Sequence, residues 1–318
     1  EIVKNTPKIG IVEIKRDWYE ADLTTRITLK KGAKAVHMKT TIENGNTKTH
    51  TDIRSGYTLA IEGGWIDVPG GRGSRKDTLG DWMVGYNEKW AFGLHSNFHE
   101  QVKGGTTWTE QFKTHTLKPG EKESYESWLQ IEYAGDAAPI IDYNLSLNDI
   151  AKGKVTGKVS NLQGEIIEKP VVAAYKKGKL IGWTTGKKGK YTINTPNGSY
   201  HLREMAEKKT PSSKKEVKIS KNNESNINLN DVKSPGQLKL NIKEADTKKP
   251  LDARIKLTGG PEYPINYLGT TTKFTNLNEK GHADFSVAPA TYDIKINSGA
   301  NFVSRKKALK DITIKSGK

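Results

Sequence analysis

The 318-residue chain contains no cysteine and no long apolar run. The lack of cysteine excludes a disulfide framework and a cysteine-ligated zinc. The lack of cysteine is equally compatible with a protein of a reducing compartment and with an exported protein. No run of about 18 apolar residues occurs, so we expect no transmembrane segment. The chain begins at Glu1 without a charged-then-apolar leader, and we expect it to be a fragment of a longer protein.

Apolar residues at helical spacing are also lacking, so no amphipathic helix is predicted. Apolar and polar residues alternate instead, as in the run 125–133, which predicts an all-β fold. The length and the turn signals divide the chain into three consecutive antiparallel β-sandwich domains, at 1–138, 153–232 and 233–318. The last two are small and transthyretin- or immunoglobulin-like. Segment 139–152 breaks the pattern and is predicted to be a linker that packs partly on its neighbours.

The last two modules repeat each other. The sequence K-P-V at 169–171 returns as K-P-L at 249–251, 80 residues later, and Gly189 returns as Gly281, 92 residues later. The 12 additional residues fall in and around the loop GGPEYPINYLGT, at 259–270. The repeat indicates two copies of one small sandwich that differ in a single loop.

The net charge of +16 is distributed unevenly along the chain. Residues 1–150 carry −2, whereas residues 151–318 carry +18. Such asymmetry suggests an anionic neighbour, which could be nucleic acid, anionic lipid or a phosphate-rich cell-wall polymer. The lysines stand singly and lack the interleaved arginines and aromatics of nucleic-acid grooves, so nucleic acid is not expected. The alternative is a lysine-rich surface that only aids solubility.

Several motifs resemble known families. The segment GKVTGKVSNLQGEIIEKPVVAAYKKGKLIGWTTGKKGKYTINTPNGSYHL resembles a carboxypeptidase regulatory-like domain, over 153–230. Residues 1–135, with LGDWMVGYNEKWAFGLH and HTLKPGEKESYESWLQI, resemble the galactose mutarotase-like supersandwich. This order is similar to the region ahead of the metal-dependent catalytic domain in CehA/McbA-type metallohydrolases. That domain would open with an H-x-H motif, which this chain lacks. The resemblance implies an accessory region of a metal-dependent hydrolase, without its catalytic domain.

Tryptophan is concentrated in the first domain, which holds Trp18, Trp65, Trp82, Trp90, Trp108 and Trp128. Aromatic rings pack on the C–H faces of sugars, while nearby carboxylates and arginines bind the hydroxyl groups. The glycine-rich segment 62–88 combines these side chains, and we expect it to form an open carbohydrate-binding pocket. The predicted site residues are Trp65, Asp67, Arg72, Asp81, Trp82 and Tyr86. The strand that follows, with Trp90, Phe92 and Leu94 on one face, is predicted to be core.

Histidine offers no clear metal site. His95 and His99 are four residues apart, but along a strand this spacing separates their side chains by roughly 13 Å. An epimerase-type His and Glu pair cannot be placed by motif, and no serine-nucleophile signature occurs. We therefore predict no metal, no cofactor and no catalytic residue in this chain.

A possible isopeptide bond is suggested by Y-x-L-x-E at 200–204. It resembles the collagen-adhesin B-type segment whose Glu promotes a Lys–Asn bond, which would assign Glu204 that role. Lys158 or Lys154 and Asn228 or Asn226 would be its partners. The alternative is that Glu204 is an ordinary surface residue.

These observations lead to one main hypothesis and two alternatives. The main hypothesis is a non-catalytic, carbohydrate-binding accessory and spacer region of a secreted or wall-associated bacterial protein. It would bind a glycan or an anionic cell-wall polymer beside a flanking catalytic domain. The alternatives are the modules of a surface adhesin or stalk, and a glycan-acting enzyme in the first domain.

Overall fold

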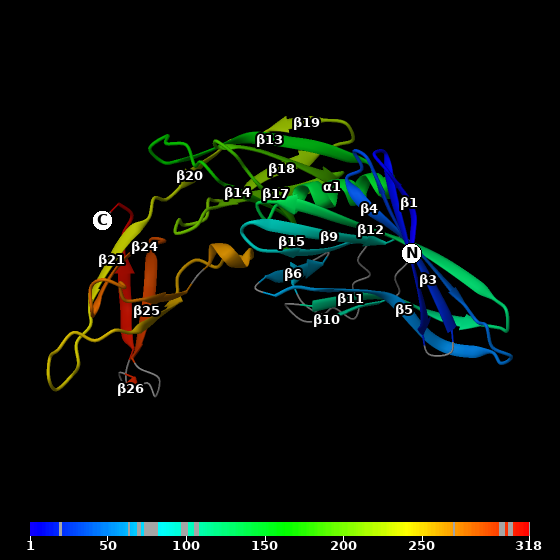
Figure 1. Cartoon of the computed structure of the whole chain (residues 1–318). Helices are drawn as coiled ribbons and strands as arrows, with labels where there is room; N and C mark the ends of the chain where they lie inside the picture. Colours follow the sequence, from blue (N-terminus) through cyan, green and yellow to red (C-terminus); the bar gives the residue numbers. More distant parts are fainter. Residues whose placement is uncertain are drawn as a thin grey trace.

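The computed structural model describes residues 1–18, 21–62, 64–68, 71–72, 82–96, 101–104, 108–269, 271–298, 303–304 and 308–317. Almost all regular structure in these residues is β-strand, in several antiparallel sheets (Figure 1). The predicted all-β class is therefore confirmed. No helix among these residues is long and apolar enough to span a membrane.

The first domain pairs a large sheet with a small one. The large sheet has the order β1-β2-β3-β4-β12-β9-β8-β6-β7, and the small sheet has the order β10-β11-β5. Its tight turns use the glycines that the sequence offers, since Gly32 and Gly120 adopt φ values of +76° and +73°. The strands are β1 (Ile2–Thr6), β2 (Ile9–Trp18), β3 (Ala21–Lys30), β4 (Ala35–Glu43), β5 (His50–Ala60), β6 (Trp65–Val68), β7 (Gly71–Arg72), β8 (Trp82–Tyr86), β9 (Trp90–Ser96), β10 (Gln101–Gly104), β11 (Trp108–Leu117) and β12 (Lys122–Tyr133).

The predicted linker 139–152 is mostly a short helix, α1 (Ala138–Leu147), a form that the sequence pattern did not predict. Asp136, two residues before the helix, accepts a 3.0 Å hydrogen bond from the backbone N–H of Ala138. The helix contacts β8, β9 and β12 on one side and β15 (Lys179–Thr185) and β16 (Lys190–Pro196) on the other. Because it is covered from two sides, its sequence lacks the single apolar stripe that identifies a surface helix.

The middle and third domains are small two-sheet sandwiches. The middle domain has the sheets β16-β13-β19, with β20 also paired to β13, and β15-β14-β17-β18. The third domain has the sheets β21-β24 and β23-β22-β25-β26, with β27 also paired to β25. Their other elements are β13 (Lys152–Asn161), β14 (Val171–Lys176), β17 (Gly198–Met205), β18 (Lys215–Ile219), β19 (Glu224–Asn226), β20 (Leu229–Val232), β21 (Gly236–Asn241), β22 (Arg254–Gly259), the 3₁₀ turn η1 (Asn266–Leu268), β23 (Thr272–Phe274), β24 (His282–Val287), β25 (Ala290–Ser298), β26 (Val303–Ser304) and β27 (Leu309–Ile314).

One part of the middle domain departs from the predicted antiparallel arrangement. Strands β19 and β20 run parallel to β13. The chain reaches them from β18, which belongs to the opposite sheet, and this change of sheet sets the parallel direction. Gly157 permits the close approach, because a Cβ atom there would lie 1.8 Å from the carbonyl oxygen of Ile227.

The three domains share a core at their junction. Tyr86 of the first domain packs against Trp183 of the middle domain and Tyr267 of the third, with ring centroids 4.7 and 6.2 Å apart. The indole N–H of Trp183 donates a 2.8 Å hydrogen bond to the carbonyl oxygen of Gly135. Tyr267 lies in the loop that distinguishes the two repeated modules, as does the fully buried Ile265. This loop therefore attaches the third domain to the other two.

Candidate functional site

The segment 62–88 does not expose all of the predicted carbohydrate-binding side chains. Asp67 and Tyr86 are buried, and the Tyr86 hydroxyl donates a 2.9 Å hydrogen bond to Asp67 Oδ2. Trp65 is half-buried, with its ring 6.3 Å from that of Tyr86. Tyr86 belongs to the junction core, because its ring packs against Trp183 of the middle domain and Tyr267 of the third domain. The assignment of Asp67 and Tyr86 to an open pocket is corrected accordingly. Asp81 and the side chains of Arg72 and Trp82 lie outside the described residues.

Strand β9 also differs from its prediction. On the predicted core face Leu94 is buried, but Trp90 and Phe92 are only half-buried, with ring centroids 4.6 Å apart; on the opposite face Ala91 and His95 are buried. Helix α1 covers that opposite face. The side chain of Ile140, from α1, packs directly on Gly93 of β9 and occupies the space that a Cβ atom there would need. Both faces of β9 are therefore covered, and the predicted single core face is corrected.

His95 is a structural histidine in this environment. Burial lowers its pKa to about 4, so the ring stays neutral at physiological pH. Its Nε2 lies 3.3 Å from Gln130 Oε1, and its ring packs against Tyr143 of α1. His99 lies outside the described residues. Among the residues that the structure describes, no three His, Asp or Glu side chains are placed to hold a metal ion.

The proposed isopeptide residues do not meet in a common interior. Lys158 and Asn228 are neighbours, since the backbone N–H of Lys158 donates a 2.9 Å hydrogen bond to Asn228 Oδ1. Both residues are exposed, as are the alternative partners Lys154 and Asn226. Glu204 is fully buried in the opposite sheet. Side chains alternate between the two faces of β13, and Lys154 and Lys158 lie on the face that points away from the interior around Glu204.

A better candidate site is a cavity of about 590 Å³ in the first domain. It lies between β2, β3, β4 and β12 of the large sheet and β5 and β11 of the small sheet, and we call it the first-domain cavity. Its lining combines aromatic rings, two arginines, a carboxylate and several hydroxyl groups. The lining residues are Ile14, Arg16, Leu23, Thr25, Ile27, Met38, Thr40, Arg54, Ser55, Gly56, Tyr57, Thr58, Glu110, Gln111, Phe112 and Tyr125.

Hydrogen bonds and ring contacts hold the aromatic lining in place. The Tyr57 hydroxyl lies 2.6 Å from Thr40 Oγ1, and its ring meets the edge of the Tyr125 ring at 6.0 Å. The guanidinium of Arg54 lies over the Phe112 ring, 5.3 Å from its centroid. Burial raises the pKa of Tyr57 to about 12, so its hydroxyl stays protonated. The cavity therefore presents fixed rings and fixed polar groups together.

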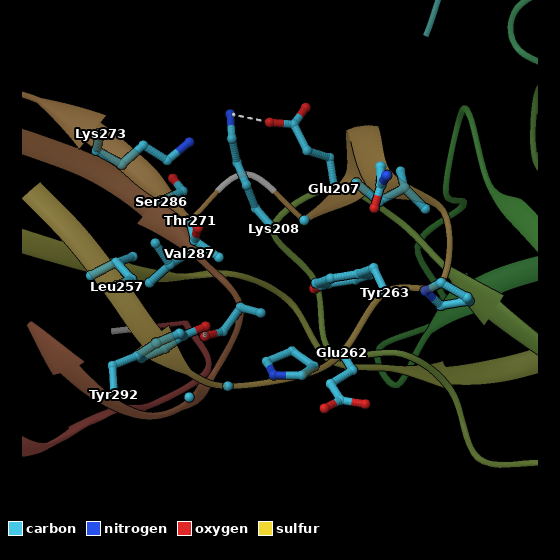
Figure 2. A pocket seen from close by; sticks show the side chains of 18 of the residues that line it. Glu207, Lys208, Leu257, Glu262, Tyr263, Thr271, Lys273, Ser286, Val287 and Tyr292 are labelled. Atoms are coloured by element: carbon cyan, nitrogen blue, oxygen red, sulfur yellow. Dashed lines mark hydrogen bonds and ion pairs between the residues drawn. The ribbon is translucent and has the colours of Figure 1, made fainter. Parts of the chain in front are cut away.

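A second cavity, of about 620 Å³, lies between the middle and third domains (Figure 2). Lys208 and Lys273 extend along one side of it, and Tyr263 and Glu262 lie on the other. Lys208 pairs with Glu207 at 3.3 Å, and the Tyr263 hydroxyl donates a hydrogen bond to a backbone carbonyl of the middle domain. Burial, with a smaller effect of Lys208, lowers the pKa of Lys273. The cavity has a basic side but no arrangement that indicates a particular ligand.

No family model and no curated protein matches the chain. Several solved structures resemble it at low identity, and three of them are described here. A protein described as an aldose 1-epimerase, from Escherichia coli K12, is 10% identical with a TM-score of 0.30, over 42% of this chain and 68% of that one. A streptococcal ancillary pilin is 11% identical with a TM-score of 0.32, over 74% and 77%. The Bacillus anthracis TIE protein is 13% identical with a TM-score of 0.23, over 98% of this chain but 56% of its own length.

TM-scores of 0.23 to 0.32 assign neither a family nor a function. The resemblance to the CehA/McbA-type metallohydrolases therefore stays a prediction.

Proposed function

We propose that this chain is a carbohydrate-binding accessory and spacer region of a larger secreted or wall-associated bacterial protein. Its glycan site is the first-domain cavity. The observation that carries the proposal is the lining of this cavity, where tyrosine and phenylalanine rings stand beside charged and hydrogen-bonding side chains.

Sugar rings need both kinds of surface. Their C–H faces pack on aromatic rings, and their hydroxyl groups form hydrogen bonds with arginine, carboxylate, amide and hydroxyl side chains. Tyr57 and Tyr125 supply rings, while Arg54 and Glu110 supply charged groups in the same cavity. Its volume of about 590 Å³ lies within the usual range of small-ligand sites.

The proposed spacer role relies on the other two domains. They carry most of the positive charge, with +18 in residues 151–318. An anionic cell-wall polymer is the partner that fits such a charge outside the cavity. This contact would complement glycan binding in the first domain.

The test is a glycan array followed by calorimetric titration of each oligosaccharide that binds. Arg54→Ala and Tyr57→Ala should each weaken binding by roughly 1–3 kcal/mol, the scale of a lost anchoring side chain. Arg26→Ala is the matched control, because Arg26 binds Glu13 at 3.0 Å and does not line the cavity. If both cavity variants bind the glycan with the affinity of the unmodified chain, the glycan site lies outside this cavity. A chain that binds no glycan would refute the proposal.

A further inference from the structure

A chain of hydrogen bonds leads from the first-domain cavity into the interior of the domain. Ser55, which lines the cavity, has its Oγ 2.8 Å from Nε2 of His115. The other ring nitrogen of His115, Nδ1, lies 2.8 Å from Oε2 of Glu123. Ser55 and His115 are 5% and 1% exposed, whereas the Glu123 side chain is 33% exposed. The sequence of groups is hydroxyl, imidazole and carboxylate.

The strand register explains why these residues meet. In the small sheet Ser55 of β5 stands opposite Lys113 of β11, and His115 follows two residues later on the same face. The ring of His115 thus lies diagonally across from Ser55. Glu123 comes from β12 of the large sheet, so the chain of bonds bridges the two sheets.

Glu123 fixes the orientation and the tautomer of the imidazole. Its carboxylate also accepts a 3.0 Å hydrogen bond from Lys113. Burial raises the pKa of Glu123, but the bonds from His115 and Lys113 outweigh this effect, so its net pKa is lowered. The ionised carboxylate holds the proton of His115 on Nδ1 and leaves Nε2 free to accept the proton of Ser55.

A tyrosine hydroxyl belongs to the same cavity as Ser55. The side chain of Tyr125 lines the cavity beside Ser55 and Thr40, whose hydroxyl groups lower its pKa by less than burial raises it. Burial raises the pKa of Tyr125, so its hydroxyl remains a proton donor. A donor beside the nucleophile can stabilise the oxyanion of a tetrahedral intermediate.

We infer that Ser55, His115 and Glu123 form an acyl-transfer triad that hydrolyses carboxylic esters entering the first-domain cavity. Such a triad is recognised by geometry and not by a sequence motif, which explains why no nucleophile signature indicated it. The activity goes beyond the proposed glycan binding and differs from the non-catalytic role expected from the sequence. If the cavity binds glycans, the substrate is an O-acylated sugar.

The reaction needs only the ester and water. Ser55 Oγ attacks the carbonyl carbon as its proton passes to His115 Nε2, and Tyr125 binds the oxyanion. The bond to the alcohol breaks, the alcohol oxygen takes the proton from His115, and an acyl-Ser55 ester remains. Water then attacks this ester and gives a proton to His115. The acid leaves, and the proton returns to Ser55.

The test is the reaction of the full chain with a fluorophosphonate probe, with the modified peptide located by mass spectrometry. This probe needs no glycan, so its outcome is separate from that of the glycan array. We expect a phosphonyl adduct on Ser55 that Ser55→Ala abolishes. His115→Asn should slow labelling by at least about a hundredfold, the usual contribution of a general base. Glu123→Gln should also slow it, since the imidazole loses its orienting carboxylate.

Ser124→Ala is the matched control, because Ser124 follows Glu123 on β12, is exposed with its Oγ 2.8 Å from Thr41 Oγ1, and does not line the cavity. It should label at the normal rate. Circular dichroism of each variant checks the fold, and Glu123→Gln keeps the test valid if His115→Asn does not fold. No adduct on Ser55 in the unmodified chain would overturn the inference. An adduct that forms equally fast in His115→Asn and Glu123→Gln would overturn it as well, because Ser55 would then react without the triad.

Discussion

Replacement of Glu204 by Gln should stabilise the protein at neutral and higher pH. Glu204 is 0% exposed, and neither of its carboxyl oxygens has a hydrogen-bond partner among the described residues. Burial raises its pKa to about 8, while Lys209 lowers it and Asp231 raises it to smaller extents. The side chain is thus held as a neutral acid in the folded middle domain.

The size of the effect follows from the two pKa values. The folded value of about 8 lies above the ordinary 4.5, so the folded state holds this proton more tightly than the unfolded state. Stability from this group is fully present below pH 4.5 and falls as the pH rises through about 8. The loss is about 3 kcal/mol at pH 7 and about 5 kcal/mol above pH 8. Gln cannot ionise, so Glu204→Gln avoids this loss.

Urea unfolding of the full chain at a series of pH values from 5 to 9 would measure the effect. The difference in unfolding free energy between Glu204→Gln and the unmodified protein isolates this one group, because the other groups contribute equally to both. The difference should grow with pH by about 1.4 kcal/mol per pH unit up to about pH 8. Glu207→Gln, at an exposed neighbouring position, should give no such trend. A difference that does not change with pH would refute the reasoning.

Three further predictions concern other parts of the molecule. Ile265→Ala, in the junction core, should cost about 2–5 kcal/mol and loosen the third domain, which small-angle scattering would detect as a larger radius of gyration; an unchanged radius would mean that other contacts hold the domain. The intact mass should match the sequence, because Lys158 and Asn228 lie outside the interior that holds Glu204; a mass lower by about 17 Da, the ammonia lost in amide exchange, would instead show an isopeptide bond. Retention on isolated cell walls should fall between low and physiological salt if residues 151–318 bind an anionic polymer, and salt-insensitive retention would argue against that contact.

The strands could be predicted because alternation is a local signal. In β12, Tyr125 and Ser127 are buried as the pattern requires. Further along the same face, Ile131 and Tyr133 are 62% and 87% exposed. At this end of β12, helix α1 packs on the other face of the sheet. Alternation shows which residues share a face, but the neighbours that cover each face belong to distant parts of the chain.

The candidate site was harder to predict for the same reason. The composition of 62–88 suggested a pocket, but composition does not reveal that two other domains cover Tyr86. The first-domain cavity collects residues from six strands, and no short segment holds enough of them to be noticed. Ser55, His115 and Glu123 likewise lie on three strands, without any spacing typical of a catalytic motif.

The junction core connects these observations to function. Comparison of the two repeats located the extra loop at 259–270, and the structure shows that its residues Ile265 and Tyr267 pack with Tyr86 and Trp183. The cavity in the first domain is therefore held in a fixed position relative to the two basic domains. A polymer whose sugar occupies the cavity would meet the basic surface at a high effective concentration, so two weak contacts could combine into one strong one. A flexible linker in place of α1 and this loop would lower that effective concentration, because the first domain and the basic domains would then move independently.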